Sequence, residues 1–249
     1  MPNTPPPQVE VEIRTPLPRA VLDGLTAAGY DLAAMASEVG LQASALDGGL
    51  TAAEADRFLC AAWAKVNNPA FGLLAAMHLK PERFGISGLA AMAAPTLFAA
   101  FQRKARYNRL VWGDQYDVTL DARELIVKVL SPDEMRPYGY AKIDMELASL
   151  TVFARLLTGV HVLPLWLSLR QPEPAYAALY AKTFQCPVRF AQADNRLAFS
   201  ADDAVRPLRS ANSAVASALT AVAESAVKPM LEPDLVARWR AFRKKGEKP

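Results

Sequence analysis

Residues 115–130, QYDVTLDARELIVKVL, are where the periodicity of the chain changes from helical to extended. Apolar residues alternate with polar ones on both sides of Asp121-Ala122. These apolar positions are Tyr116, Val118, Leu120, Leu125, Val127 and Val129. A two-residue period on either side of a turn predicts a β-hairpin. Because Ile126 and Leu130 add apolar side chains to the other face, we expect the second strand to be covered on both faces.

The region before the hairpin reads as a series of helices with recognisable start signals. Thr51 and Glu54 form a capping-box pattern. Further starts are predicted at Asp31, at Asn68-Pro69 and at Pro95-Thr96, because these residue types cap a first helical turn or fit into it. Gly40 is expected to end the helix that begins at Asp31.

After the hairpin, helical and extended patterns alternate. A helix is predicted over 140–158 with Gly159 as its stop, and Ser210 is expected to cap a later helix that Pro229 and Pro233 end. Strands are predicted at 165–169, 188–190 and 197–199, with a short helix over 175–182. This order predicts an α+β fold, a helix-rich domain with a small, mainly antiparallel or mixed sheet covered by helices.

Composition divides the chain into three parts. Residues 1–18 hold six prolines and are expected to form a flexible arm, and residues 19–230 are long enough for one domain with its own core. Residues 231–249 are predicted to form a basic amphipathic helix and tail. Its apolar side, Leu235, Trp239 and Phe242, is a candidate partner or dimer surface.

The excess of basic over acidic side chains lies in the last residues of the chain. The whole sequence has 28 basic and 25 acidic side chains. Setting aside the six basic residues and Glu247 within 238–249 leaves 22 basic and 24 acidic side chains. A slightly acidic body has no general attraction for phosphates, so direct DNA binding by this chain is not expected.

Residues 31–46 resemble a helix-turn-helix only superficially. Gln42 and Ser44 could reach bases, whereas Asp31, Glu38 and Asp47 would repel DNA.

The common signatures of catalysis and cofactor binding are missing from the sequence. Two cysteines and two histidines have no metal-ligand spacing, and no glycine-rich phosphate loop occurs, so no metal or cofactor is expected. Gly85-Ile86-Ser87-Gly88 is similar to a nucleophile elbow, but Leu89 stands where that motif needs glycine, and we expect a tight turn there. A small-molecule enzyme using His78 or His161 remains the least favoured alternative.

Two blocks of sequence resemble a known family. The first is Pro81-Glu82-Arg83-Phe84-Gly85, Gly88-Leu89 and Pro95-Thr96-Leu97 with Ala100, Tyr107 and Leu110. The second is Phe184-Gln185-Cys186-Pro187-Val188-Arg189-Phe190, Asn195, Leu197, Phe199 and Pro207-Leu208. In order and spacing they are similar to the N-terminal, arabinose-binding-like domains of AraC-type regulators. The resemblance covers about Pro18 to Lys228.

The resemblance implies a bacterial, cytoplasmic effector-sensing domain that binds a small molecule or mediates dimerisation. In that family two helix-turn-helix units follow, and no such pattern follows Leu231 in this sequence. A second hypothesis is a stand-alone module that pairs with a full-length regulator. No segment reads as a signal peptide or a membrane span.

A sensor needs a mostly apolar pocket with a few polar anchors. The candidate ligand contacts are Arg106, Tyr107, Trp112, Tyr138, Trp166 and Arg170. Arg103, Lys104, Arg106 and Arg109 form a basic helical pattern that we interpret as a solvated surface, with a counter-charge for an acidic effector as the alternative.

Overall fold

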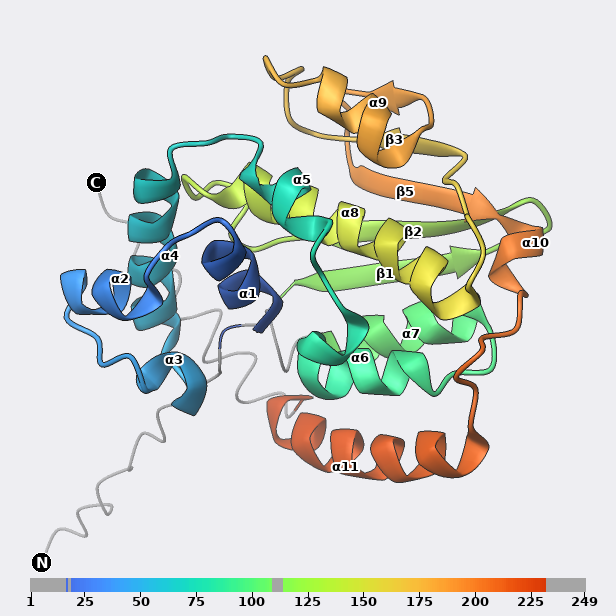
Figure 1. Cartoon of the computed structure of the whole chain (residues 1–249). Helices are drawn as coiled ribbons and strands as arrows, with labels where there is room; N and C mark the ends of the chain where they lie inside the picture. Colours follow the sequence, from blue (N-terminus) through green and yellow to red (C-terminus); the bar gives the residue numbers. More distant parts are fainter. Residues whose placement is uncertain (1–16, 18, 109–113, 232–249) are drawn as a thin grey trace, which may run out of the picture.

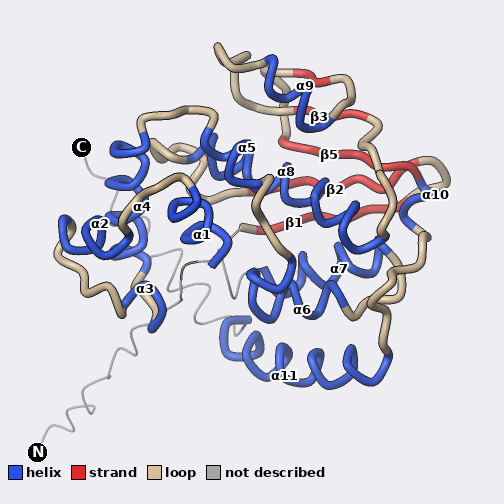
Figure 2. Tube along the Cα trace, in the orientation of Figure 1, coloured by secondary structure: helices blue, strands red, loops and turns tan. Residues whose placement is uncertain are grey.

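A computed structural model of the chain describes residue 17, residues 19–108 and residues 114–231. One mixed sheet of five strands, in the order β1-β2-β5-β3-β4, is accompanied by helices (Figure 1; Figure 2). The predicted α+β class is confirmed.

The elements follow the predicted order closely. The strands are β1 Gln115–Leu120, β2 Glu124–Leu130, β3 Trp166–Ser168, β4 Val188–Arg189 and β5 Asn195–Ser200. The helices before the sheet are α1 Arg19–Ala27, α2 Leu32–Glu38, α3 Ala45–Gly48, α4 Ala52–Val66, α5 Phe71–Ala76, the 3-10 turn η1 Pro81–Phe84, α6 Gly85–Met92 and α7 Leu97–Tyr107. The later helices are α8 Gly139–Thr158, α9 Ala178–Phe184, α10 Ala201–Ala204 and α11 Ser213–Leu231.

The hairpin is confirmed, but the covering of its second strand is not. Strands β1 and β2 pair antiparallel, with Val118 opposite Val127. Along β2 the residues alternate between buried and half-buried, and Leu130 is 45% exposed. The expectation that β2 is covered on both faces is therefore wrong for the described residues. Ile126 and Leu130 belong to a face of the sheet that stays partly open.

Helix α8 lies across the buried face of the sheet and is enclosed by other elements (Figure 1). It packs against α5, against α7 and against strands β2 and β5. The five apolar positions predicted to face inward are all buried: Ile143, Leu147, Leu150, Ala154 and Leu157. Its polar residues Lys142, Asp144 and Glu146 are buried as well. The helix therefore places charged groups in the interior of the domain.

Most of the predicted helix signals act as expected. Asp31 accepts from the backbone amides of Ala33 and Ala34, and the Thr51–Glu54 capping box is present. Gly40 and Gly159 adopt positive φ after their helices.

Other predicted boundaries were wrong. The helix expected at Asn68-Pro69 begins at Phe71, and the helix over 175–182 lies at 178–184. Ser210 does not cap α11, because its hydroxyl donates to the carbonyl of Met92 and the side chain of Asn212 accepts from Val215 instead. Residues 85–88 begin α6 rather than a tight turn.

The sequence blocks that carry the family resemblance perform structural tasks. The carbonyl of Pro81 lies so close to Gly88 that a Cβ there would come within 1.7 Å of it. Arg83 donates two hydrogen bonds to Asp23 of α1, at 2.5 and 2.6 Å. Thr96 bridges to Pro207, which joins the two blocks. These residues hold elements of the fold together.

Candidate functional site

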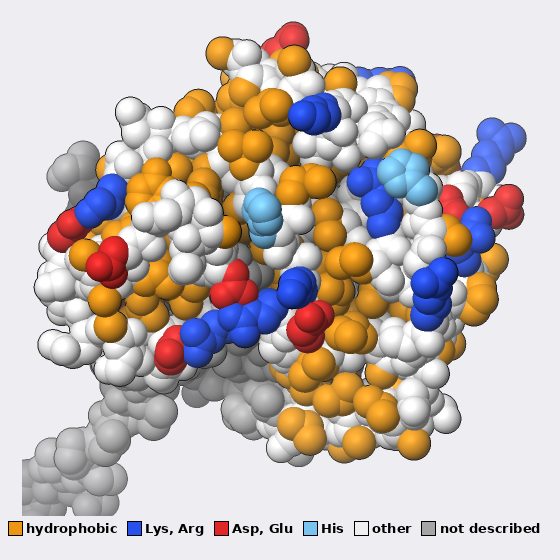
Figure 3. Space-filling model, viewed as in Figure 1, with side chains coloured by type: hydrophobic (Ala, Val, Ile, Leu, Met, Phe, Trp, Pro, Cys, Tyr) orange, Lys and Arg blue, Asp and Glu red, His pale blue; other side chains and the backbone are white. Residues whose placement is uncertain are grey.

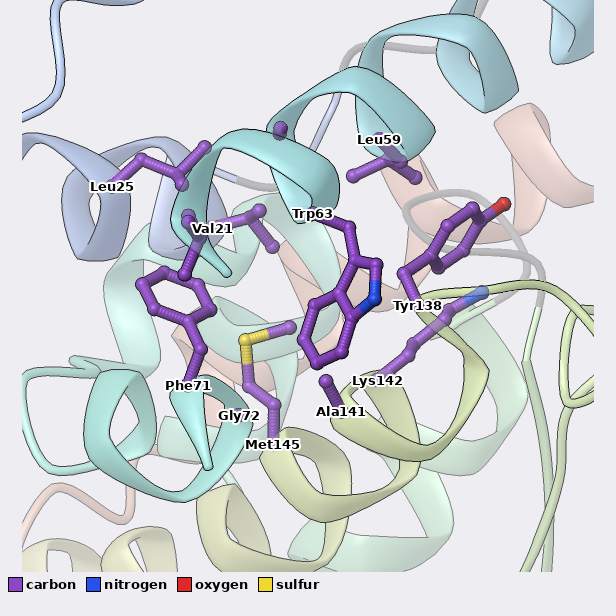
Figure 4. A pocket seen from close by; sticks show the side chains of 12 residues that line it. Val21, Leu25, Leu59, Trp63, Phe71, Gly72, Tyr138, Ala141, Lys142 and Met145 are labelled. Atoms are coloured by element: carbon purple, nitrogen blue, oxygen red, sulfur yellow. The ribbon is translucent and has the colours of Figure 1, made fainter. Parts of the chain in front are cut away.

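An apolar pocket lies where α1, α4, α5 and α8 meet (Figure 4). Its volume is about 50 Å³. It is lined by Val21, Leu25, Leu59, Ala62, Trp63, Val66, Phe71, Gly72, Tyr138, Ala141, Lys142 and Met145. Most of this lining is buried, whereas Leu59, Trp63 and Phe71 are half-buried and form the outer part. The pocket has room for roughly three to five water-sized groups.

Polar groups gather at the end of the pocket formed by Tyr138 and Lys142. The Tyr138 hydroxyl donates to Asp56 Oδ1 at 3.0 Å, and Arg136 lies 3.2 Å from the same oxygen. Burial, with the nearby carboxylates adding to it, raises the pKa of the Tyr138 phenol, which therefore stays protonated. The Lys142 ammonium is 2.7 Å from Asp133 and 3.1 Å from Asp114.

The indole of Trp63 is the polar group of the lining that stands apart from these ion pairs. In Figure 4 its ring lies over Ala141 and its nitrogen points toward the side on which Tyr138 and Lys142 lie. Among the described residues, Trp63 Nε1 has no hydrogen-bond partner, unlike Tyr138 and Lys142. An indole N–H is a donor only, so the pocket offers one donor on an otherwise apolar wall.

A buried ion pair lies one helical turn along α8 from Lys142. Lys104 of α7 and Glu146 of α8 are each 1% exposed, with 3.4 Å between ammonium and carboxylate. Lys104 also donates to the Tyr116 hydroxyl at 2.9 Å and to Asn108 Oδ1 at 3.2 Å, and Tyr116 donates to Glu146. The Lys104 ammonium lies 4.8 Å from the ring centre of Phe84, an arrangement typical of a cation–π contact.

Asn108 and Asp114 connect this pair to Lys142. Asn108 donates to the backbone carbonyl of Asp114, whose carboxylate faces Lys142. Burial raises the pKa of Asp114 and outweighs the opposing effect of Lys142, and burial likewise raises the pKa of Glu146 against the lowering effect of Lys104. The pocket is thus linked to α7 through consecutive polar contacts.

A separate buried carboxylate lies on another side of α8. Asp144 accepts hydrogen bonds from Tyr180 at 2.5 Å, from Tyr176 at 3.0 Å and from Gln171 at 2.8 Å. Burial raises its pKa to about 7, against the lowering effect of these three donors. These hydrogen bonds hold α9 against α8.

The titration of Asp144 should make the stability of the domain depend on pH. Because the pKa of Asp144 is about 7 in the folded chain and 3.8 ordinarily, the folded state holds its proton more tightly, and stability falls as pH rises between these values. Asp144→Asn should reduce the fall in unfolding free energy between about pH 5 and pH 8, as measured by urea denaturation. Asp117→Asn, on the exposed edge of β1, should keep the wild-type slope. An unchanged slope in Asp144→Asn would contradict the assigned shift.

The structure does not bring the predicted ligand contacts together. Tyr138 lines the pocket. Trp166 lies on the partly open face of the sheet and donates to Glu124 at 3.0 Å. Arg170 pairs with Glu134 at 2.7 Å on the surface. Trp112, together with Leu235, Trp239 and Phe242, lies outside the described residues.

Arg106 and Tyr107 contact α11. Arg106 Nη2 donates to Glu224 at 2.7 Å, and the Tyr107 hydroxyl donates to the same carboxylate at 2.8 Å. The hydrogen bonds from Arg106 and Tyr107 lower the pKa of Glu224 to about 2, so this carboxylate stays charged. The two residues hold α11 in place, and they lie away from the pocket lining.

The interpretation of the basic pattern as a solvated surface is wrong at Lys104. The side chain of Arg103 is half-buried and donates to the carbonyl of Ala90, and Arg106 is exposed. Lys104 points inward to Glu146, while Arg109 lies outside the described residues. Sequence reasoning therefore named Lys104 but not its buried pairing, and it did not single out Trp63, Lys142 and Glu146. No local pattern could show these contacts, because the carboxylate that pairs with Lys104 is distant in sequence.

No catalytic constellation forms among the described residues. Both histidines are exposed, and Figure 3 shows the two pale-blue imidazole side chains apart from each other. Ser87 is buried and donates to the backbone carbonyl of Lys104. Within the described ranges, no group of three potential metal ligands is present. None of the helices in the described part is long and apolar enough to cross a membrane.

A second hollow lies on the surface near the end of α8. It has a volume of about 350 Å³ and is lined by Lys80, Pro81, Glu82, Met92, Leu156, Leu157, Arg209 and Ser210. Five of these eight residues are exposed. A ligand there would keep much of its surface in water, so the smaller but mainly buried pocket is the better candidate site.

Comparison with known proteins agrees with this architecture. The structure of the transcriptional regulator CdpR from Pseudomonas aeruginosa superimposes with a TM-score of 0.59 at 21% sequence identity. The match covers 82% of this chain and 61% of that one, so the chain spans less than two thirds of its structural relative. No curated protein matches.

A family model also matches residues 29–208, which is most of the chain and includes both sequence blocks that carry the resemblance. The model is described as the N-terminal arabinose-binding domain of AraC transcription regulators. The chain belongs to this family of AraC-type regulatory domains.

Proposed function

We propose that this domain senses a small-molecule effector and that the effector binds in the apolar pocket between α1, α4, α5 and α8. The observation that carries this proposal is an apolar, mainly buried pocket whose inner wall is helix α8, the helix that also holds the buried ion pairs. Binding pockets are usually apolar with a few placed polar groups. The domain binds its effector without converting it.

The contacts around α8 suggest how a ligand in the pocket would affect other parts of the domain. Lys142 lines the pocket, and Glu146 on the next turn pairs with Lys104 of α7. The same helix α7 carries Arg106 and Tyr107, which hold Glu224 of α11. A ligand that binds one arrangement of α8 more tightly than another would shift this connected set of contacts. In the proposal, α11 is the element whose contacts change when a ligand occupies the pocket.

Thermal-shift screening tests the proposal. Amino acids, sugars, fatty acids, aromatic acids and small neutral ketones form the library. A true effector should raise Tm by roughly 5–10 °C at about 100 times its Kd, since it stabilises only the folded state. No shift with any class would contradict the sensing function.

Two matched substitutions on α4 locate the binding. Ala62 lines the pocket and is 4% exposed, so Ala62→Leu should fill the space and abolish the shift. Ala53 on the same helix is exposed, so Ala53→Leu should leave the shift intact. Ala62→Val is the milder filling variant if the leucine lowers stability too far. A shift that survives filling would place the ligand elsewhere.

A further inference from the structure

We infer that the pocket selects an uncharged, slender and mainly aliphatic ligand that carries one hydrogen-bond acceptor, and that Trp63 Nε1 donates to this acceptor. The inference rests on the proposed function and adds the chemical class of the effector. It follows from three properties of the lining, namely its shape, its unused donor and the charges behind it.

The first property is the narrow apolar volume. The pocket measures about 50 Å³, which is roughly a third of the volume of an engineered cavity of about 150 Å³ that binds benzene. Aliphatic and aromatic side chains form the wall, among them Leu59, Phe71 and Met145. A chain of a few methylene groups fits this space, and a sugar does not, because its hydroxyls would lose their water partners. The name of the family therefore does not describe the ligand of this pocket.

The second property is the hydrogen-bonding capacity of the wall. Tyr138 already donates to Asp56, and Lys142 is held by Asp114 and Asp133. Among the described lining residues, the indole N–H of Trp63 is the donor that these pairings leave available. An indole nitrogen donates and cannot accept, so the ligand must supply an acceptor such as a carbonyl oxygen.

The third property is the charge behind the polar end. Three carboxylates, those of Asp56, Asp114 and Asp133, lie next to two cations, Arg136 and Lys142. Each cation already has a carboxylate partner at 3.2 Å or less. A ligand carboxylate would have to compete with these partners and lose its hydration in an apolar wall. The arrangement disfavours a negatively charged ligand, so we expect the ligand to be neutral.

Isothermal titration calorimetry with three probe classes tests this inference. The probes are acetone and 2-butanone, which match a pocket with room for roughly three to five water-sized groups, together with carboxylates of the same length and L-arabinose. The ketones should bind the wild-type chain and the Ala53→Leu control, and they should not bind Ala62→Leu. Trp63→Phe keeps an aromatic ring but removes the donor, so it should weaken ketone binding roughly two- to tenfold.

The same hydrogen bond can be removed from the ligand. In a 2-methyl-1-alkene, a CH₂ group replaces the carbonyl oxygen of the ketone with little change in shape. The alkene accepts no hydrogen bond from the indole, so Trp63→Phe should leave its affinity nearly unchanged, whereas the same substitution should weaken binding of the ketone. In the wild-type chain, the NMR signal of the Trp63 indole proton should move downfield when the ketone binds and stay near its free position when the alkene binds, which decides the question even if Trp63→Phe fails to fold.

The outcomes separate the ligand class from the function. Tighter binding of carboxylates or arabinose, or equal ketone binding by wild type and Trp63→Phe, would overturn the class while leaving a sensing domain. Ketone binding that persists in Ala62→Leu would overturn the site. If neither these probes nor any compound of the screening library binds, the proposed function itself fails.

Discussion

Lys104→Ala is expected to lower the free energy of unfolding by about 3–5 kcal/mol, because it leaves the carboxylate of Glu146 buried without its cation. Both side chains are 1% exposed, and Tyr116 alone would remain as a donor to the carboxylate. Urea denaturation at neutral pH measures the loss. A loss below about 1 kcal/mol would contradict a buried pair at this position.

Two controls identify the cause of this loss. Lys65→Ala removes the cation of an exposed pair with Glu38, whose side chains are 41% and 54% exposed, and should cost less than about 1 kcal/mol. The double variant Lys104→Met, Glu146→Leu removes both charges and should recover most of the stability, since apolar side chains of similar volume often replace a buried pair without loss. If the double variant is as unstable as Lys104→Ala, lost packing rather than an unpaired charge is responsible.

Gly72→Ala is expected to destabilise the domain by at least about 3 kcal/mol, through a clash that no rotamer change can relieve. A Cβ at position 72 would lie 2.0 Å from the backbone carbonyl oxygen of Ala141. Helices α5 and α8 would have to separate, and the pocket that Gly72 and Ala141 both line would change shape. Thermal and urea unfolding measure the effect.

Gly48→Ala provides the matched control for this substitution. Gly48 lies in the short helix α3, and a Cβ there would meet no atom within 4 Å. Its stability should stay within about 1 kcal/mol of the wild type, with any change favouring alanine in a helix. Similar behaviour of the two variants would contradict the close approach of α5 and α8.

Much of the fold could be predicted from local pattern. The hairpin at 115–130 follows from a two-residue alternation, and α4 follows from the Thr51–Glu54 capping box. Boundaries were wrong where a competing contact decided them, as at Ser210, whose hydroxyl bonds to Met92 instead of capping α11. Local signals predict which elements form, while long-range contacts set where some of them begin.

The candidate site could be predicted only in part. Tyr138 was expected as a ligand contact and does line the pocket, whereas Trp63 and Lys142 were not singled out. Helix α8 carries charged residues among its apolar ones, and charged residues in a helix are usually exposed to water. They are buried here because α7, α9 and the residues around 114 supply partners for Lys142, Asp144 and Glu146.

The sequence by itself determined the class of fold, the order of its elements and the family, because these depend on periodicity, capping residues and motifs that are local along the chain. Tertiary structure alone decided which charges are buried and where a pocket lies. Burial of Lys104 against Glu146, 42 residues away, and the meeting of α1, α4, α5 and α8 around Trp63 depend on distances between segments far apart in the chain.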